Sequence, residues 1–181
     1  MPITKLEAAQ RQLNCAIRLL FDNDDLTSVI TLSSAAFRLL YDLYPTLSQD
    51  GFRADVNKVI GRYGWDRFNK FANYLKHADK DPSAQIEPHP IYAMTTIGFA
   101  VILYHRVTDA PTAETRAWDA FMAVVEPVVF AGPPDPNAEG YADFNSAVIQ
   151  YKDASHEDKM ALARQLLEDS IESLRNVTAP S

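Results

Sequence analysis

The sequence predicts an all-α protein, an antiparallel bundle of about seven to eight helices. Apolar residues recur at three- and four-residue spacing along several long segments, the pattern of a helix that buries one face. Two of these segments open on Thr or Ser followed three residues later by an acid, which is the spacing of a capping box. Proline and glycine fall between the periodic segments, where helices are expected to end.

The first two predicted helices form a hairpin. Thr4 and Glu7 have capping-box spacing, and the acidic turn 22–25 ends the first helix and caps the second. This turn lacks the ligand spacing of a calcium loop. The second helix is expected over 26–44, with Pro45 as its end, and the short connection favours antiparallel packing. Four small residues of the second helix allow a close helix contact: Ser33, Ser34, Ala35 and Ala36.

The middle of the chain predicts a short helix and a buried one. The short helix covers 52–60 and is followed by two glycines, Gly61 and Gly64, that break the chain. The loop 79–90 carries three prolines and His89, and is a candidate lid or boundary. The segment 91–107 is apolar nearly all round, which is typical of the buried centre of a bundle. A strand is the alternative there, and the length favours a helix.

The carboxy-terminal part predicts three more helices. One covers 113–126, capped by Thr112, and its large apolar residues form a core stripe or, alternatively, a ligand-stacking cluster. The segment 128–140 is rich in proline and glycine and is expected to be irregular. A helical pair follows over 141–152 and 155–175.

Length and composition predict one cytoplasmic domain. The 181 residues suit a single domain, 1–181, with a core at 4–126 and the helical pair at 141–176. Cys15 is the only cysteine, so no internal disulfide is possible and a reducing cytoplasm is expected. The first twelve residues show no secretion signal. The apolar run 91–104 is shorter than the roughly 20 residues of a membrane span.

The charge argues against DNA binding. The net charge is −7 and the pI is about 5.0, whereas general nucleic-acid binders neutralise phosphates with excess basic residues. Between residues 62 and 82, however, five basic residues stand against three acids, a local balance of +2. Such a basic face suits a phosphate or an acidic partner, and an ordinary solvated helix face is the alternative interpretation.

The candidate site is the stretch 67–82, RFNKFANYLKHADKDP, predicted as one amphipathic helix that runs into a charged turn. At 100° per residue its apolar and polar residues fall on separate arcs, each about 100° wide. Proline stops the turn, because the residue before proline avoids helical dihedrals. The apolar arc is Phe68, Phe71, Ala72 and Leu75; the polar arc is Arg67, Lys70, Asn73, Tyr74 and His77, and Lys80 follows in the turn.

His77 is the weak candidate for a catalytic residue, and a structural role is the alternative. It lies at a predicted helix end, where the helix dipole favours a proton on the imidazole. The sequence contains no phosphate-binding glycine loop, HExxH, CxxC or GxSxG. His77, Asp79 and Asp81 place three ligand types in one turn, which is weak evidence for a metal. We predict no metal site and no cofactor.

Three segments carry a resemblance to a known family: RQLNCAIRLLF, VITLSSAAFRLLYDL and FANYLKHADKDP. They resemble a group of bacterial helical proteins in which an ANFFKHADRDP-like segment follows a hairpin with small residues. The resemblance covers roughly residues 5–82, and the architecture is similar to that of the HEPN superfamily. It implies an antiparallel bundle that forms a homodimer. Many members are ribonucleases or nucleotide-linked modules.

The resemblance leads to three functional hypotheses. In the superfamily's catalytic pattern four to six residues separate an arginine from a histidine. Here six residues separate Lys70 from His77, but Lys70 is a lysine, which lacks the guanidinium fork that clamps phosphate. The first hypothesis is therefore a non-catalytic module that binds a nucleotide, RNA or an acidic protein partner. The second is a metal-independent ribonuclease with a degenerate motif, and the third is a protein-interaction scaffold. The expected ligand-binding residues are Arg67, Lys70, Asn73, Tyr74, His77 and Lys80.

Overall fold

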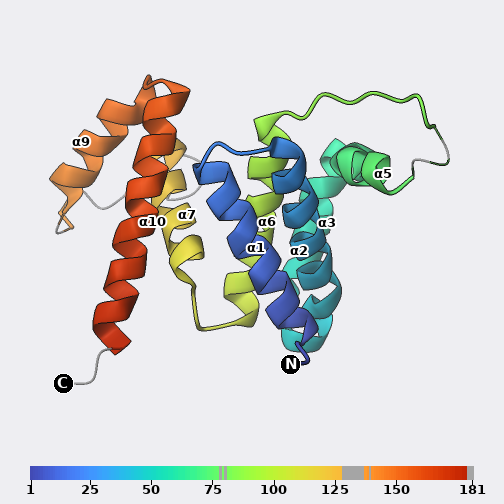
Figure 1. Ribbon diagram of the computed structural model, residues 1–181. Coiled ribbons are helices and arrows are strands. Elements are labelled where there is room, and N and C mark those ends of the chain that lie inside the picture. Colours follow the sequence, from blue (N-terminus) through green and yellow to red (C-terminus); the bar gives the residue numbers. More distant parts are fainter. Residues whose placement is uncertain (78, 80, 128–136, 139, 179–181) are drawn as a thin grey trace. The chain divides into compact units, whose positions relative to one another are not determined.

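The computed structural model describes residues 1–77, 79, 81–127, 137–138 and 140–178, and this part of the chain holds nine α-helices and no strand. The predicted all-α class is confirmed (Figure 1). The helices form two compact units, Met1–Ala110 and Pro111–Ser181, which are described separately. The helices are α1 Lys5–Phe21, α2 Leu26–Leu47, α3 Phe52–Tyr63, α4 Trp65–Phe68, α5 Lys70–Lys76, α6 Pro90–Val107, α7 Ala113–Val125, α9 Tyr141–Lys152 and α10 His156–Thr178.

In the first unit, α2 packs against both α1 and α6 (Figure 1). The predicted capping box of α1 is present, with the Thr4 hydroxyl accepting from the Glu7 N–H and the Glu7 carboxylate accepting from the Thr4 N–H. The Asp25 carboxylate caps α2 by accepting from the Ser28 N–H at 2.8 Å. The segment 91–107, for which a strand was the alternative, lies within helix α6.

Small side chains line the contacts among these three helices. Alanine and serine keep the side-chain layer thin, so that helix backbones approach closely and the larger apolar groups interdigitate around them. Of the four small residues expected at a close contact of the second predicted helix, Ser33 and Ala36 are buried, whereas Ser34 and Ala35 are partly exposed. The fully buried or nearly buried small residues are Ala9 and Ala16 of α1, Ser33 and Ala36 of α2, and Ala93 and Ala100 of α6.

Two predicted helix ends are wrong. Pro45 lies inside α2, which continues to Leu47, because a proline near the helix end removes only one backbone donor. The helix ends one turn later, where the Ser48 N–H donates to the Tyr44 carbonyl at 2.8 Å. Likewise α3 runs through Gly61, which tolerates the helix at modest cost. The helix ends at Gly64, whose φ of 86° favours glycine.

The predicted single helix from residue 67 is also wrong, because the chain forms α4 and α5 with a break at Asn69. Asn69 has φ −88° and ψ 2°, between the ideal helix and a turn. Two aromatic contacts hold α4 against α2: Phe68 lies 5.0 Å from Phe37 and Trp65 lies 5.5 Å from Tyr41, between ring centroids. The extra helix raises the number of described helices above the predicted seven to eight.

Only part of the predicted apolar arc is buried. Phe71 is 2% exposed, whereas Phe68 and Ala72 are half-buried and Leu75 is 38% exposed. The break at Asn69 changes the direction of the chain between Phe68 and the rest of the arc. One continuous core stripe therefore does not form along 67–82.

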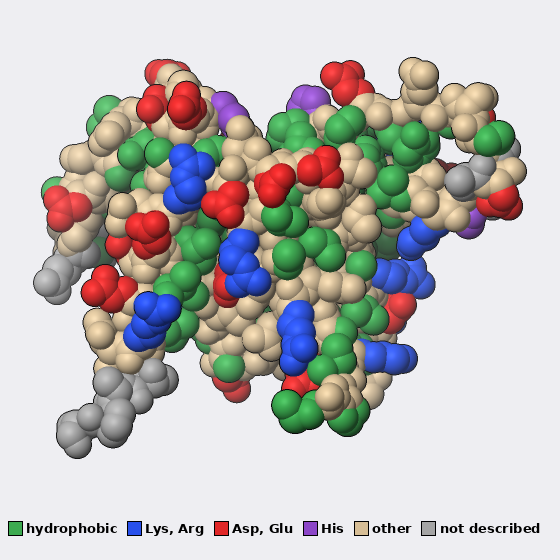
Figure 2. All heavy atoms as spheres, in the orientation of Figure 1, with side chains coloured by type: hydrophobic (Ala, Val, Ile, Leu, Met, Phe, Trp, Pro, Cys, Tyr) green, Lys and Arg blue, Asp and Glu red, His purple; other side chains and the backbone are tan. Residues whose placement is uncertain are grey.

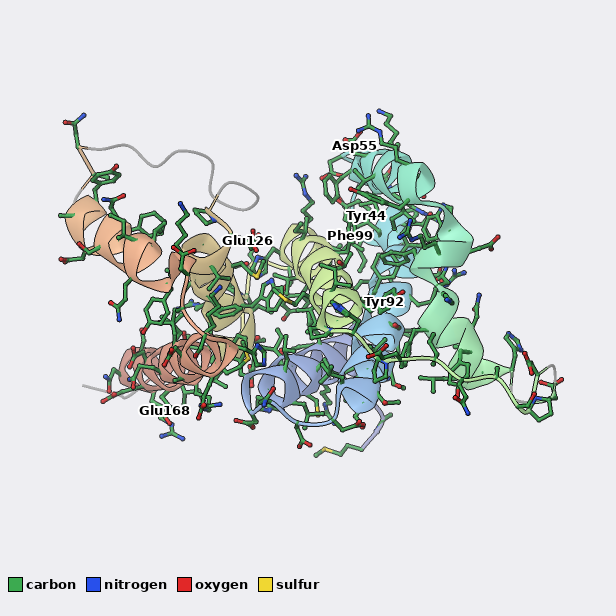
Figure 3. The ribbon with its side chains drawn as sticks, turned by 90° about the horizontal axis from the view of Figure 1, so that it is seen from above. Tyr44, Asp55, Tyr92, Phe99, Glu126 and Glu168 are labelled. Atoms are coloured by element: carbon green, nitrogen blue, oxygen red, sulfur yellow. The ribbon has the colours of Figure 1, made fainter. Side chains whose placement is uncertain are left out.

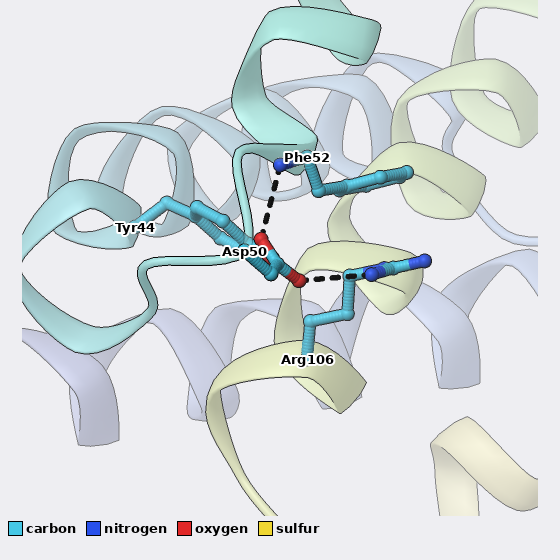
Figure 4. A network of polar contacts seen from close by, with 4 residues as sticks. All are labelled: Tyr44, Asp50, Phe52 and Arg106. Atoms are coloured by element: carbon cyan, nitrogen blue, oxygen red, sulfur yellow. Dashed lines mark hydrogen bonds and ion pairs between the residues drawn. The ribbon is translucent and has the colours of Figure 1, made fainter.

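A carboxylate at the start of α3 links α2, α3 and α6 (Figure 4). Asp50 accepts from the Tyr44 hydroxyl at 2.7 and 2.8 Å, from the Phe52 N–H at 3.0 Å, and from the Arg106 guanidinium at 2.9 Å. Arg106 also lies over the Phe52 ring, 3.8 Å from its centroid. The Tyr44 hydrogen bond, then the Phe52 N–H and Arg106, lower the pKa of Asp50 from 3.8 to about 2.

The second unit is built around α7. Helix α10 packs mainly against α7, and α9 also packs against α7. The predicted caps are present, since the Thr112 hydroxyl accepts from the Thr115 N–H and the Ser155 hydroxyl accepts from the Asp158 N–H. The largest fully buried side chain of this unit is that of Trp118. The indole therefore belongs to the core, as the stripe interpretation of 113–126 expected.

The boundary between the two compact units differs from the boundary in the predicted subdivision. The prediction grouped the segment that forms α7 with the core at 4–126, whereas the units separate at Ala110. Most of the segment 128–140, predicted to be irregular, lies outside the described residues. A single domain over 1–181 stays a prediction. Among the described helices, none combines the length and apolar character needed to cross a membrane.

The small-residue packing of α2 can be tested with Ala36→Leu. Ala36 is 0% exposed, so three extra carbons have no space, and we expect a loss of about 1–3 kcal/mol in the free energy of unfolding. Urea unfolding followed by circular dichroism measures it. Ala54→Leu on the exposed face of α3 is the control and should change stability by less than about 0.5 kcal/mol. Equal losses in the two variants would contradict close packing at Ala36.

The Asp50 network predicts a pH-dependent stability. Asp50→Asn should lower the Tm at neutral pH, because an amide cannot replace the anion between Tyr44 and Arg106. Since the folded-state pKa is depressed, the stabilisation is present above the ordinary value of 3.8 and is lost as the pH falls through about 2. The difference in Tm between wild type and variant should shrink across that range in thermal scans. A constant difference would contradict the assignment.

Candidate functional site

A cleft of about 510 Å³ opens in the first unit between α3, α4 and α6. Its walls are mainly apolar and aromatic, and its volume lies within the range of about 300–1,000 Å³ typical of small-molecule sites. All the elements that form it belong to one compact unit. The lining residues are Val59, Ile60 and Tyr63 of α3, Arg67 and Phe68 of α4, and Ile91, Tyr92, Thr95, Thr96 and Phe99 of α6.

One face of α6 forms a wall of the cleft. Tyr92, Thr95, Thr96 and Phe99 follow helical spacing, so they lie on the same side of α6. Figure 3 shows Tyr92 and Phe99 on the side of α6 that faces α3 and α4. The Thr96 hydroxyl donates to the Tyr92 carbonyl at 2.7 Å, which satisfies that polar group within the helix. Thr95, in contrast, is exposed on this face.

Aromatic contacts fix the base of the cleft. The Phe68 and Phe99 rings meet edge to face, 5.8 Å apart, and Phe37 of α2 lies 6.2 Å from Phe99. Tyr92 lies 6.3 Å from Phe71. Such ring pairs add stability beyond their buried area and hold the rings in fixed orientations. The base is therefore preorganised, with the α4 and α6 rings held against the hydrophobic core.

Large apolar side chains are exposed at the rim. Val59 is 40% exposed, Tyr63 69% and Ile91 56%, and all three line the cleft. Scattered exposed apolar residues are ordinary, but a group around a cleft is typical of a binding site. The rim therefore offers apolar surface that a ligand can cover.

Among the described residues, Arg67 is the only charged one that lines the cleft. It is exposed, and the described part of the chain provides it with no hydrogen-bond or ion-pair partner. Elsewhere charges are mixed: Figure 2 shows acidic and basic side chains interspersed over α1 and over α10. An unpaired guanidinium beside apolar walls gives the cleft a local positive charge in a chain of net charge −7.

The predicted ligand-binding residues do not line one cavity. Arg67 lines the cleft, Lys70 lines a neighbouring hollow, and Asn73 lines a third with the last residue of α5. Tyr74 donates from its hydroxyl to the Ala84 carbonyl at 3.2 Å. Lys80 lies outside the described residues.

His77 lies at the carboxy-terminal end of α5, and its ring is exposed. It does not line the cleft or either of the two hollows that Lys70 and Asn73 line, and the described residues give it no polar partner. Asp79 and Asp81 follow in the same exposed turn. No group of three or more His, Cys, Asp or Glu side chains arranged to hold a metal ion occurs among the described residues.

Sequence reasoning missed most of the cleft, including its walls from α3 and α6. One signal was present: Tyr92, Thr95 and Thr96 interrupt an otherwise apolar helix on one face. Polar residues at helical spacing in a buried helix indicate a face that is not fully covered by neighbouring helices. The contribution of α3 had no comparable signal, because Val59 and Tyr63 read as ordinary helix residues.

Comparisons with known proteins found no matching family model, no similar curated protein and no similar solved structure.

The exposure of His77 predicts that it contributes little to stability. His77→Ala should change the free energy of unfolding by less than about 0.5 kcal/mol, because the side chain is exposed and has no hydrogen-bond partner among the described residues. Urea unfolding measures the change. A decrease in Tm of several degrees would instead support a structural role for the imidazole.

Proposed function

We propose that this protein is a non-catalytic binding module whose cleft takes a small organic anion with an aromatic or apolar body. The observation that carries the proposal is the cleft of about 510 Å³, in which aromatic walls meet one unpaired cation, Arg67. Apolar walls supply most of the affinity of a small-molecule site, and a few polar groups set its orientation.

The flat apolar body and the anionic group of the proposed ligand each match a feature of the cleft. Tyr63, Tyr92 and Phe99 provide ring surfaces on which a flat ligand can stack. Arg67 presents a planar, permanently charged guanidinium, which binds carboxylate, phosphate or sulfonate through two parallel hydrogen bonds. A nucleoside monophosphate belongs to this class, since it joins an aromatic base to an anionic group.

We propose that the protein is non-catalytic because of the residues that line the cleft. No histidine and no carboxylate lines the cleft in the described part of the chain, so it lacks the usual groups for general acid–base chemistry. The ribonuclease hypothesis uses His77, which lies outside the cleft. It stays an alternative for the end of α5, as does the interaction scaffold.

The sequence resemblance supports the same class of function. Antiparallel packing of the bundle, a HEPN-like architecture, a cytoplasmic location and a homodimer belong to this proposal as expectations from that resemblance. RNA and an acidic protein partner are larger members of the anionic ligand class, and the small volume of the cleft favours a small molecule over both.

Isothermal titration calorimetry with naphthalene-2-sulfonate, a flat aromatic monoanion, tests the proposal. Adenosine monophosphate is titrated in parallel as a nucleotide of the same ligand class. We expect wild type to bind, and Arg67→Gln to bind the sulfonate about fivefold to tenfold more weakly through loss of a charge-assisted hydrogen bond. Neutral 2-naphthol should bind both proteins equally. Thr95→Trp introduces a large side chain that fills the cleft from an exposed position. It should abolish binding of both naphthalene-2-sulfonate and 2-naphthol.

Arg62→Gln is the matched control, because Arg62 is exposed on α3 and does not line the cleft. Circular dichroism should show that each variant keeps its helical content. Binding that is unchanged in both Arg67→Gln and Thr95→Trp would place the ligand elsewhere and would overturn the proposal.

A further inference from the structure

A second hollow, of about 440 Å³, lies beside the cleft. The two cavities share Ile91 and Tyr92, so these side chains form a ridge that both cavities touch. Unlike the cleft, the second hollow is lined largely by polar and charged side chains. Its lining residues are Lys70 of α5, Gln85, Ile86, Glu87 and His89 of the segment before α6, and Ile91 and Tyr92 of α6.

The break at Asn69 places one cation in each cavity. Arg67 lies in α4 and lines the cleft, whereas Lys70 begins α5 and lines the second hollow. Both side chains are exposed, and neither has a hydrogen-bond or ion-pair partner among the described residues. Two unpaired cations thus lie on either side of the Ile91–Tyr92 ridge.

The wall of the second hollow is held in place at both ends. The Tyr74 hydroxyl of α5 donates to the Ala84 carbonyl at 3.2 Å. At the other end His89 caps α6, with its Nδ1 accepting from the Ile91 N–H at 3.2 Å. Because Nδ1 is the acceptor, the neutral ring carries its proton on Nε2, where it can donate to a ligand.

The polar groups of this hollow favour an anion and moderate its binding. Lys70 supplies the positive charge, while the Gln85 amide and His89 Nε2 supply neutral donors. Glu87 is the only acid that lines the hollow in the part of the chain that the structure describes, and its charge opposes an anion there. Replacing Lys70 and replacing Glu87 should therefore shift anion affinity in opposite directions.

We propose, on the basis of the function inferred above, that the two cavities form one elongated site for a dianion. The ligand has a rigid apolar body and an anionic group at each end. One anionic group binds Arg67 in the cleft, the body lies across Ile91 and Tyr92, and the second anionic group binds Lys70.

Matched aromatic sulfonates test this by isothermal titration calorimetry on the full chain. Two pairs differ only in the second charge: naphthalene-2-sulfonate with naphthalene-2,6-disulfonate, and biphenyl-4-sulfonate with biphenyl-4,4′-disulfonate. In wild type at least one dianion should bind about fivefold more tightly than its monoanion. This factor is at the upper end of what an exposed ion pair contributes to affinity. Lys70→Gln should abolish this preference and leave monoanion affinity unchanged, while Glu87→Gln should increase the preference about twofold.

Lys76→Gln is the matched control, since Lys76 is exposed on the same helix and lines neither cavity. It should keep the wild-type preference. The inference is overturned if neither dianion is preferred in wild type, or if the preference persists in Lys70→Gln. In those cases monoanion binding that depends on Arg67 still supports the proposed function. If no monoanion binds, both proposals fail.

Discussion

The close packing of α2 against α1 and α6 is the constraint on which the first unit depends. Small buried side chains on all three helices allow this approach, and the large apolar residues fill the space around them. Helix α6 packs against α2 and α1, and another of its faces is left partly uncovered. That face carries Tyr92, Thr95 and Phe99, and it becomes a wall of the cleft.

The opposite walls depend on how α3 and α4 are attached to this core. The Asp50 carboxylate joins the end of α2 and the start of α3 to Arg106 at the end of α6. Two aromatic contacts then hold α4 on α2. These contacts place Val59 and Arg67 at the cleft, and the same attachment directs Lys70 to the neighbouring hollow.

Local patterns predicted the helices well, including the capping box at Thr4 and the cap at Ser155. Errors occurred where tertiary contacts override a local preference. Pro45 and Gly61 were expected to end helices, but each costs the helix little stability at its position. Packing extends each helix beyond that residue. Asn69 gave no comparable breaking signal, and the break between α4 and α5 lies beside Phe68, whose ring contacts Phe37 and Phe99.

By itself the sequence determined that the chain is helical, where most helices begin, and which residues are apolar enough to form a core. Helical periodicity and capping act between residues a few positions apart, so they are visible in the order of residues. The tertiary structure alone decided that Arg67 and Lys70, three positions apart, line different cavities, and that α3 and α6 complete the cleft. Those arrangements depend on contacts between residues far apart in the chain, which no local pattern records.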